Sequence, residues 1–140
     1  MSITIYHNPA CGTSRNVLAI LQAAGANPEV VDYLETGWSR DQLVALFADA
    51  GLTPKSALRV SKSPAEALGL TAEGVSDDDI LDAMLVHPVL VNRPIVVTPK
   101  GTRLCRPSEV VLDLLATLPP GPLYKEDGEM LINAAGERVA

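Results

Sequence analysis

The stretch that decides the fold is residues 3–33, which read ITIYHNPACGTSRNVLAILQAAGANPEVVDY. A β-branched and aromatic run at 3–6 predicts a first strand, and the run at 29–33 predicts a second. Between them, apolar residues recur at helical spacing until Gly25, and Thr13 or Ser14 is expected to cap the start of this helix. A strand, a helix and a further strand in so short a length predict a parallel βαβ unit.

The segment at about 38–88 is predicted to be helical throughout. Ser39 and Gln42 have the spacing of a capping box, and the acidic run after Ser76 suits a helix N-terminus. Cap-then-proline pairs at 53–54 and 63–64 predict two short helices.

Residues 94–105 return to strand character. A strand at 94–98, a turn at 99–101 and a returning strand at 102–105 predict a hairpin, and Pro107 is placed at the first position of a last helix. The order β-α-β, helical insertion, β-β-α is that of an α/β thioredoxin-like fold with a mixed sheet. We therefore expect one catalytic domain over 1–118, with the insertion at about 38–88. The tail 119–140 is expected to pack on this domain or extend it, as a small hairpin or a surface strand.

Composition narrows the classes of protein that remain possible. The chain has 140 residues, a formal net charge of −6 and two cysteines. The acidic balance argues against non-specific binding to nucleic acid, and two cysteines are too few for a disulfide scaffold. No signal peptide and no run long enough to cross a membrane are visible, which predicts a cytoplasmic protein without a membrane partner.

Cys11 is the candidate nucleophile. It lies in the loop between the first strand and its helix, where the helix dipole and the free N–H groups of Gly12, Thr13 and Ser14 favour a thiolate and can bind an anion. The alternative is an inert, buried cysteine, which the surrounding loop residues disfavour.

His7 ends the first strand and has two interpretations. A protonated imidazole facing Cys11 would lower the pKa of the thiol, whereas a histidine bonded only to backbone would be structural. The sequence favours neither.

Two arginines stand symmetrically about the predicted hairpin. Arg93 immediately precedes its first strand and Arg106 immediately follows its second, so both guanidinium groups are expected at the same open end. Paired guanidinium groups suit a tetrahedral oxyanion and would repel each other without one. Either arginine alone would more often be a solvated surface residue, as Arg59 in the insertion is expected to be.

Several segments resemble the glutaredoxin-coupled arsenate reductases. They are IYHNPACGTSR at 5–15, YLET at 33–36, NRPIVVT at 92–98, GTRLCRPSE at 101–109 and KEDGE at 125–129. The resemblance spans nearly the whole chain and implies a thioredoxin-like fold in which Pro94 is cis and faces the nucleophile.

The resemblance also implies the roles of individual residues. Cys11 would attack arsenate, His7 would favour its thiolate, and three arginines would hold the oxyanion, namely Arg59, Arg93 and Arg106. Asn8 and Arg15 would shape the loop.

The mechanism implied by the resemblance uses external thiols. Glutathione would add to the Cys11–arsenic adduct and take arsenic to As(III), glutaredoxin would remove the glutathione as a mixed disulfide, and water would release arsenite. Glutathione is thus a co-substrate, and neither a bound cofactor nor a metal is implied. Cys105 would be a strand residue rather than a resolving thiol.

Three other classes compete with this interpretation. A general disulfide oxidoreductase or a polymerase-binding regulator of the Spx type would normally carry Cys-x-x-Cys, but Ser14 occupies the fourth position. A cysteine phosphatase would place arginine six residues after the cysteine, where Val17 stands. Binding of RNA polymerase would favour the regulator.

Overall fold

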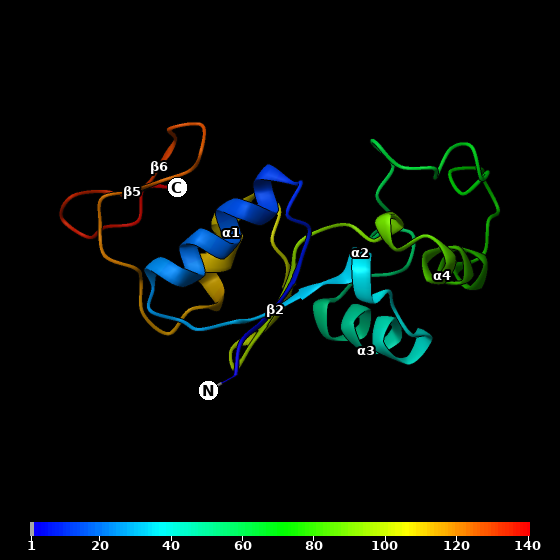
Figure 1. The fold of residues 1–140 in the computed structure, drawn as a ribbon, viewed down its shortest axis with the longest axis horizontal. Helices are drawn as coiled ribbons and strands as arrows, with labels where there is room; N and C mark the ends of the chain where they lie inside the picture. The colour runs from blue at the N-terminus through cyan, green and yellow to red at the C-terminus, as the bar shows by residue number, and fades with distance from the viewer. Residues whose placement is uncertain (1) are drawn as a thin grey trace. The chain divides into compact units, whose positions relative to one another are not determined.

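The computed structural model describes residues 2–140, which form two compact units. One unit holds the chain up to Asp32 together with Arg93–Ala140, and the other is Tyr33–Asn92 (Figure 1). The helical insertion predicted at about 38–88 falls inside the second unit. Among the described residues, no helix has the length and apolar character needed to cross a membrane.

A four-stranded mixed sheet forms the centre of the first unit. Its strands are β1 (Thr4–His7), β2 (Glu29–Asp32), β3 (Ile95–Thr98) and β4 (Gly101–Leu104), in the order β2-β1-β3-β4. β1 and β2 run parallel, whereas β3 runs antiparallel to both β1 and β4. This is the predicted βαβ unit followed by a β-hairpin.

Helix α1 (Gly12–Ala23) connects β1 to β2. Its N-cap is Cys11, one residue before the helix, so the prediction of a Thr13 or Ser14 cap was wrong. The hydroxyl of Ser14 is turned back to the loop, where it accepts a hydrogen bond from the N–H of Asn8 at 3.0 Å. The helix ends as predicted, with Gly25 in the left-handed conformation at φ +75°.

The core of this unit lies between the sheet, α1 and η2 (Ser108–Leu114). The predicted last helix is a 3₁₀ helix, because its N–H groups bond three residues back, as Val110 does to Pro107 at 3.1 Å. Pro107 precedes this helix in an extended conformation instead of forming its first turn, which corrects the prediction. The adjacent β-branched residues Val110 and Val111 disfavour a regular α-helix.

The C-terminal tail forms a small hairpin of β5 (Leu123–Tyr124) and β6 (Met130–Ile132). Leu131 and Ile132 are fully buried and belong to the core of the first unit. Of the two forms expected for the tail, the structure has the hairpin.

The second unit is built from short helices. They are α2 (Tyr33–Thr36), α3 (Arg40–Ala50), α4 (Asp77–Val86) and the 3₁₀ helix η1 (Pro88–Leu90). The capping box at Ser39 and the cap at Ser76 are confirmed. The prediction of short helices after 53 and 63 was wrong, because both segments form hydrogen-bonded turns that do not continue as helices.

Candidate active site

Cys11 lies at the junction between the loop after β1 and the first turn of α1. Cys11 is a free cysteine that is buried, with 8% of the residue exposed. The N–H of Cys11 donates to the carbonyl of Asn8 at 3.0 Å, and its own carbonyl accepts from the N–H of Arg15 at 3.0 Å. The N–H of Ser14 is directed at the sulfur, as expected at a helix N-terminus.

Ser14 is the centre of a buried hydrogen-bond network that shapes this loop. Its hydroxyl lies 2.6 Å from Nδ1 of His7 and accepts from the N–H of Asn8. The Asn8 side chain accepts in turn from the N–H of Ala10 at 3.0 Å. His7, Asn8 and Ser14 are all buried, so the conformation of the loop depends on these polar contacts being satisfied.

His7 fits neither of the interpretations drawn from the sequence. Its ring bonds the Ser14 hydroxyl instead of the thiol or the backbone. Burial lowers the pKa of His7, the carboxylate of Asp32 opposes this effect, and the charge of Arg15 adds to it. A neutral imidazole that orients Ser14 is therefore the form that the structure favours.

Arg93 and Arg106 meet at the open end of the β3–β4 hairpin, as predicted. Nη1 of Arg106 lies 3.7 Å from the Cys11 sulfur and donates to the carbonyl of Arg93 at 3.1 Å. Arg93 is 8% exposed, and its guanidinium also donates to the Cys11 sulfur. The Arg93–Pro94 peptide bond is cis, which confirms the conformation expected from the resemblance.

These contacts determine the ionisation of Cys11. Burial of the sulfur is the largest single influence on the pKa of Cys11, and it raises that pKa. Opposing contributions come from the N–H of Ser14, the charge of Arg93 and side-chain hydrogen bonds from Arg93 and Arg106. Together they outweigh burial, so the pKa of Cys11 lies below that of an ordinary thiol and the site favours the nucleophilic thiolate.

Cys105 has the opposite character. It follows β4, its side chain is 0% exposed, and burial raises the pKa of its thiol to about 12. Attack on a disulfide requires an accessible thiolate, so Cys105 is poorly suited to act as a resolving thiol.

Arg59 belongs to the second unit. Only 8% of it is exposed, which corrects the expectation of a surface residue. Its N–H donates to the carbonyl of Leu90 at 2.7 Å, and Nε donates to the carbonyl of Ser61 at 2.9 Å. The local chain therefore fixes the direction of this guanidinium.

Comparison with known proteins identifies the family to which this site belongs. The sequence pattern of the ArsC family matches residues 6–114, which include Cys11 and both arginines of the hairpin. The chain belongs to the ArsC family.

Full-length relatives in the ArsC family share more than half of their residues with this chain. An arsenate reductase of Synechocystis sp. is 63% identical over 98% of each chain, and one of Escherichia coli is 54% identical over 99% of this chain and 98% of its own. Two solved structures superpose on this chain, and both are 41% identical to it in sequence. The arsenate reductase from Vibrio cholerae has a TM-score of 0.77, with 82% of this chain and 98% of its own covered. The putative arsenate reductase from Yersinia pestis has a TM-score of 0.75, with 80% and 99% covered. These neighbours confirm the thioredoxin-like fold.

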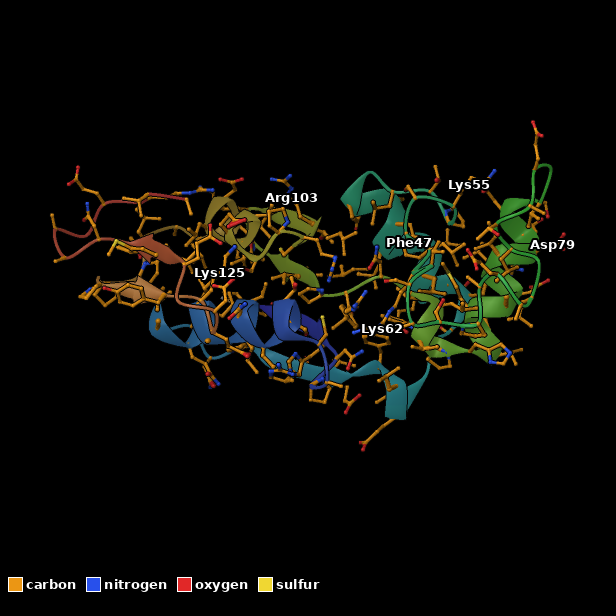
Figure 2. All side chains as sticks on the ribbon, turned by 90° about the horizontal axis from the view of Figure 1, so that it is seen from above. Phe47, Lys55, Lys62, Asp79, Arg103 and Lys125 are labelled. Atoms are coloured by element: carbon orange, nitrogen blue, oxygen red, sulfur yellow. The ribbon has the colours of Figure 1, made fainter. Side chains whose placement is uncertain are left out.

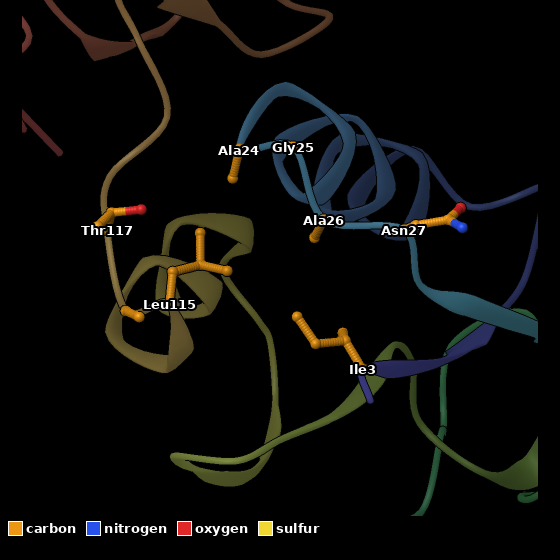
Figure 3. A pocket seen from close by; sticks show the side chains of 8 residues that line it. Ile3, Ala24, Gly25, Ala26, Asn27, Leu115 and Thr117 are labelled. Carbon is orange, nitrogen blue, oxygen red and sulfur yellow. The ribbon is translucent and has the colours of Figure 1, made fainter. Parts of the chain in front are cut away.

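An open hollow in the first unit lies away from this chemistry. It has a volume of about 310 Å³ and is lined by Ile3, the end of α1 with the loop to Asn27, and residues 115–117 (Figure 3). Its lining carries no ionisable side chain, and it borders the C-terminal end of α1, whereas Cys11 is at the N-terminal end.

Residues 2–140 contain no group of three or more His, Cys, Asp or Glu side chains arranged to hold a metal.

One contact of the active-site loop was missed by sequence reasoning. Nε of Arg15 donates to the carboxylate of Glu126 at 2.7 Å, and Nη1 donates to the carbonyl of Pro9 at 2.9 Å. The partners Arg15 and Glu126 are 111 residues apart. Each sits in a segment that carries the family resemblance, but no local pattern could have paired them.

Proposed function

We propose that this protein is an arsenate reductase that converts arsenate to arsenite with Cys11 as the nucleophile. The observation that carries the proposal is a thiolate-favouring cysteine at a helix N-terminus, with the guanidinium groups of Arg93 and Arg106 both directed at its sulfur. Arsenate is a tetrahedral oxyanion, and the same groups that stabilise the thiolate can stabilise it. The full-length relatives named arsenate reductases support this choice of oxyanion.

In the first step, the Cys11 thiolate attacks As(V) and forms an S–As bond as one oxygen leaves as water. Arg93 and Arg106 hold the remaining oxygens and balance their charge through the change in coordination. Ser14, fixed by His7 and Asn8, presents its N–H toward the sulfur and keeps it at the helix terminus.

The later steps use external thiols. Glutathione condenses with the adduct and a second water leaves, which gives an arsenic bonded to both the Cys11 sulfur and the glutathione sulfur. Exchange of oxygen for sulfur does not change the oxidation state, so arsenic is still As(V). A glutaredoxin thiolate then attacks the glutathione sulfur, a mixed disulfide forms, and the electron pair of the broken S–As bond stays on arsenic.

Electron balance therefore places the two-electron reduction at the glutaredoxin step, whereas the family resemblance suggested the addition of glutathione. Water then releases arsenite and restores Cys11. The cytoplasm, where glutathione keeps thiols reduced, would suit this sequence of reactions. The substrate-binding role predicted for Arg59 stays a prediction.

The experiment is arsenate-dependent oxidation of NADPH in the presence of glutathione, glutaredoxin and glutathione reductase. We expect turnover by the wild type, loss of turnover in Cys11→Ser, and retention in the matched control Cys105→Ala. Omission of glutaredoxin should also abolish turnover. Absence of turnover by the folded wild type, or activity in Cys11→Ser, would overturn the proposal.

A further inference from the structure

The C-terminal hairpin makes two contacts with the helix that carries Cys11. The Glu126 carboxylate accepts from Nε of Arg15, with its two oxygens at 2.7 and 3.2 Å. The N–H of Glu126 donates to Oδ1 of Asn16 at 2.9 Å. Arg15 and Asn16 lie four and five residues after Cys11, in the first turns of α1. The side chain and the backbone of Glu126 therefore both bind the start of the helix that follows the nucleophile.

The same hairpin is attached to the segment that follows Arg106. Nζ of Lys125 lies 2.8 Å from the Glu109 carboxylate, and the two side chains are only 11% and 15% exposed. Lys125 is labelled in Figure 2, where it extends from the hairpin toward the body of the first unit. Glu109 is in η2, which begins two residues after Arg106. Adjacent hairpin residues therefore bind the two segments that supply the sulfur and a guanidinium of the site.

One of these contacts continues into the active-site loop. The Arg15 guanidinium that binds Glu126 also donates to the carbonyl of Pro9, two residues before Cys11. A chain of hydrogen bonds thus runs from the hairpin through Arg15 to the Cys11 loop.

The hairpin follows the part of the chain that the family pattern matches. The family pattern ends at residue 114, whereas the hairpin begins at Leu123. The full-length relatives nevertheless cover 98–99% of this chain, so most of the hairpin lies within the length that they share with it. The attachment of the hairpin beside both site segments therefore points to a role in the site itself.

We propose that the C-terminal hairpin is a strap that sets the spacing between Cys11 and Arg106, with Glu126 and Lys125 as positioning residues. The contact that depends on this spacing is the one between Nη1 of Arg106 and the Cys11 sulfur, which are 3.7 Å apart. Hydrogen bonds weaken steeply with distance and angle, so a small displacement of either segment weakens the stabilisation of the thiolate.

This role differs from a contribution to stability. The side chains of Arg15 and Glu126 are each 47% exposed, and ion pairs in water contribute little to the free energy of folding. Loss of the pair should leave the fold almost unchanged while the geometry around Cys11 relaxes. The charges that act on Cys11 within this unit are those of Arg15, Arg93 and Arg106, and the strap contacts only the first of these directly.

The test is the pH profile of Cys11 alkylation by iodoacetamide, followed by mass spectrometry of the peptide that contains Cys11. Glu126→Gln removes the ion pair, and Asn16→Ala releases the backbone of Glu126 without a change of charge. Glu137→Gln is the matched control, because this tail carboxylate bonds only Asn133 among the described residues. Thermal unfolding of each variant verifies that it is folded.

We expect the inflection of the profile to move to higher pH in Glu126→Gln and in Asn16→Ala, with alkylation below the inflection slowed by about threefold because less thiolate is present. The profile of Glu137→Gln should match that of the wild type. The direction of the shift separates this positioning role from a purely electrostatic one. If Glu126→Gln removed only a negative charge and moved no segment, Arg15 would be less neutralised and the inflection would move to lower pH. An unchanged or lowered inflection in either variant, or an equal rise in Glu137→Gln, would overturn the proposal.

The catalytic meaning of the strap rests on the proposed function, since it assumes that the Cys11 thiolate is the nucleophile. Alkylation needs neither arsenate nor glutathione, so the two proposals fail separately. A shifted profile in a protein without arsenate turnover would remove the reductase assignment and keep the strap. Normal arsenate turnover together with unshifted alkylation profiles would keep the reductase assignment and remove the strap.

Discussion

Replacement of Ser14 by alanine should destabilise the protein far more than the loss of one hydroxyl suggests. The Ser14 side chain is 0% exposed, and its oxygen has two buried partners, Nδ1 of His7 and the N–H of Asn8. Alanine can bond neither, and the surrounding side chains leave little access for water. Two polar groups would therefore be buried without their partner.

The magnitude follows from these two groups. Each buried polar atom left unsatisfied costs about 1–3 kcal/mol. The higher helix propensity of alanine within α1 returns about 0.5 kcal/mol. We therefore expect a loss of about 1.5–5.5 kcal/mol in the free energy of unfolding. This loss corresponds to a fall in Tm of about 5–17 °C for a chain of this length.

The assay is equilibrium unfolding in urea, followed by far-UV circular dichroism. The matched control is Thr13→Ala in the same helical turn, because the Thr13 hydroxyl has no hydrogen-bond partner among the described residues. The control should change the free energy of unfolding by less than about 0.5 kcal/mol. Equal stabilities of Ser14→Ala and Thr13→Ala would refute the reasoning, since the buried network would then contribute nothing to the fold.

Three further predictions concern the thiols and the tail. Arg106→Leu should move the inflection of Cys11 alkylation to higher pH, because a cation that lowers the thiol pKa is lost; an unchanged inflection measured by mass spectrometry would contradict the 3.7 Å contact. Cys105 should resist iodoacetamide up to pH 9 in the folded protein and react only after denaturation, because its pKa is raised to about 12; modification at the rate of an exposed thiol would show that it is not buried. Gly121→Ala should destabilise the protein by more than about 2 kcal/mol in urea unfolding, because the added Cβ would overlap the backbone of Asn133, and a neutral effect would place the tail differently.

The elements that the sequence predicted well are those with local signals. The residue types and spacing of the apolar side chains indicate β1 and α1, and Gly25 indicates where the helix ends. The turn between its strands indicates the β3–β4 hairpin. The meeting of Arg93 and Arg106 then required only the register of that hairpin. Family resemblance added the cis peptide bond before Pro94, which no local pattern could supply.

The elements that the sequence predicted poorly depend on competition between local and tertiary partners. Ser14 was a reasonable N-cap by type, but the buried N–H of Asn8 and the ring of His7 take its hydroxyl, and Cys11 is left as the cap. The turns after residues 53 and 63 have helix-start signals without enough length to continue as helices. The partnership of Arg15 with Glu126 spans 111 residues and could not be inferred from spacing.

The central claim, that Cys11 itself bonds arsenic, is tested most directly by arsenic K-edge X-ray absorption of the protein frozen with arsenate and glutathione in the absence of glutaredoxin. This condition holds the reaction before the reduction, so the covalent adduct should accumulate. The account predicts sulfur in the arsenic coordination shell of the wild type and an all-oxygen shell with Cys11→Ser. An all-oxygen shell in the folded wild type, or the same sulfur signal from both proteins, would contradict it.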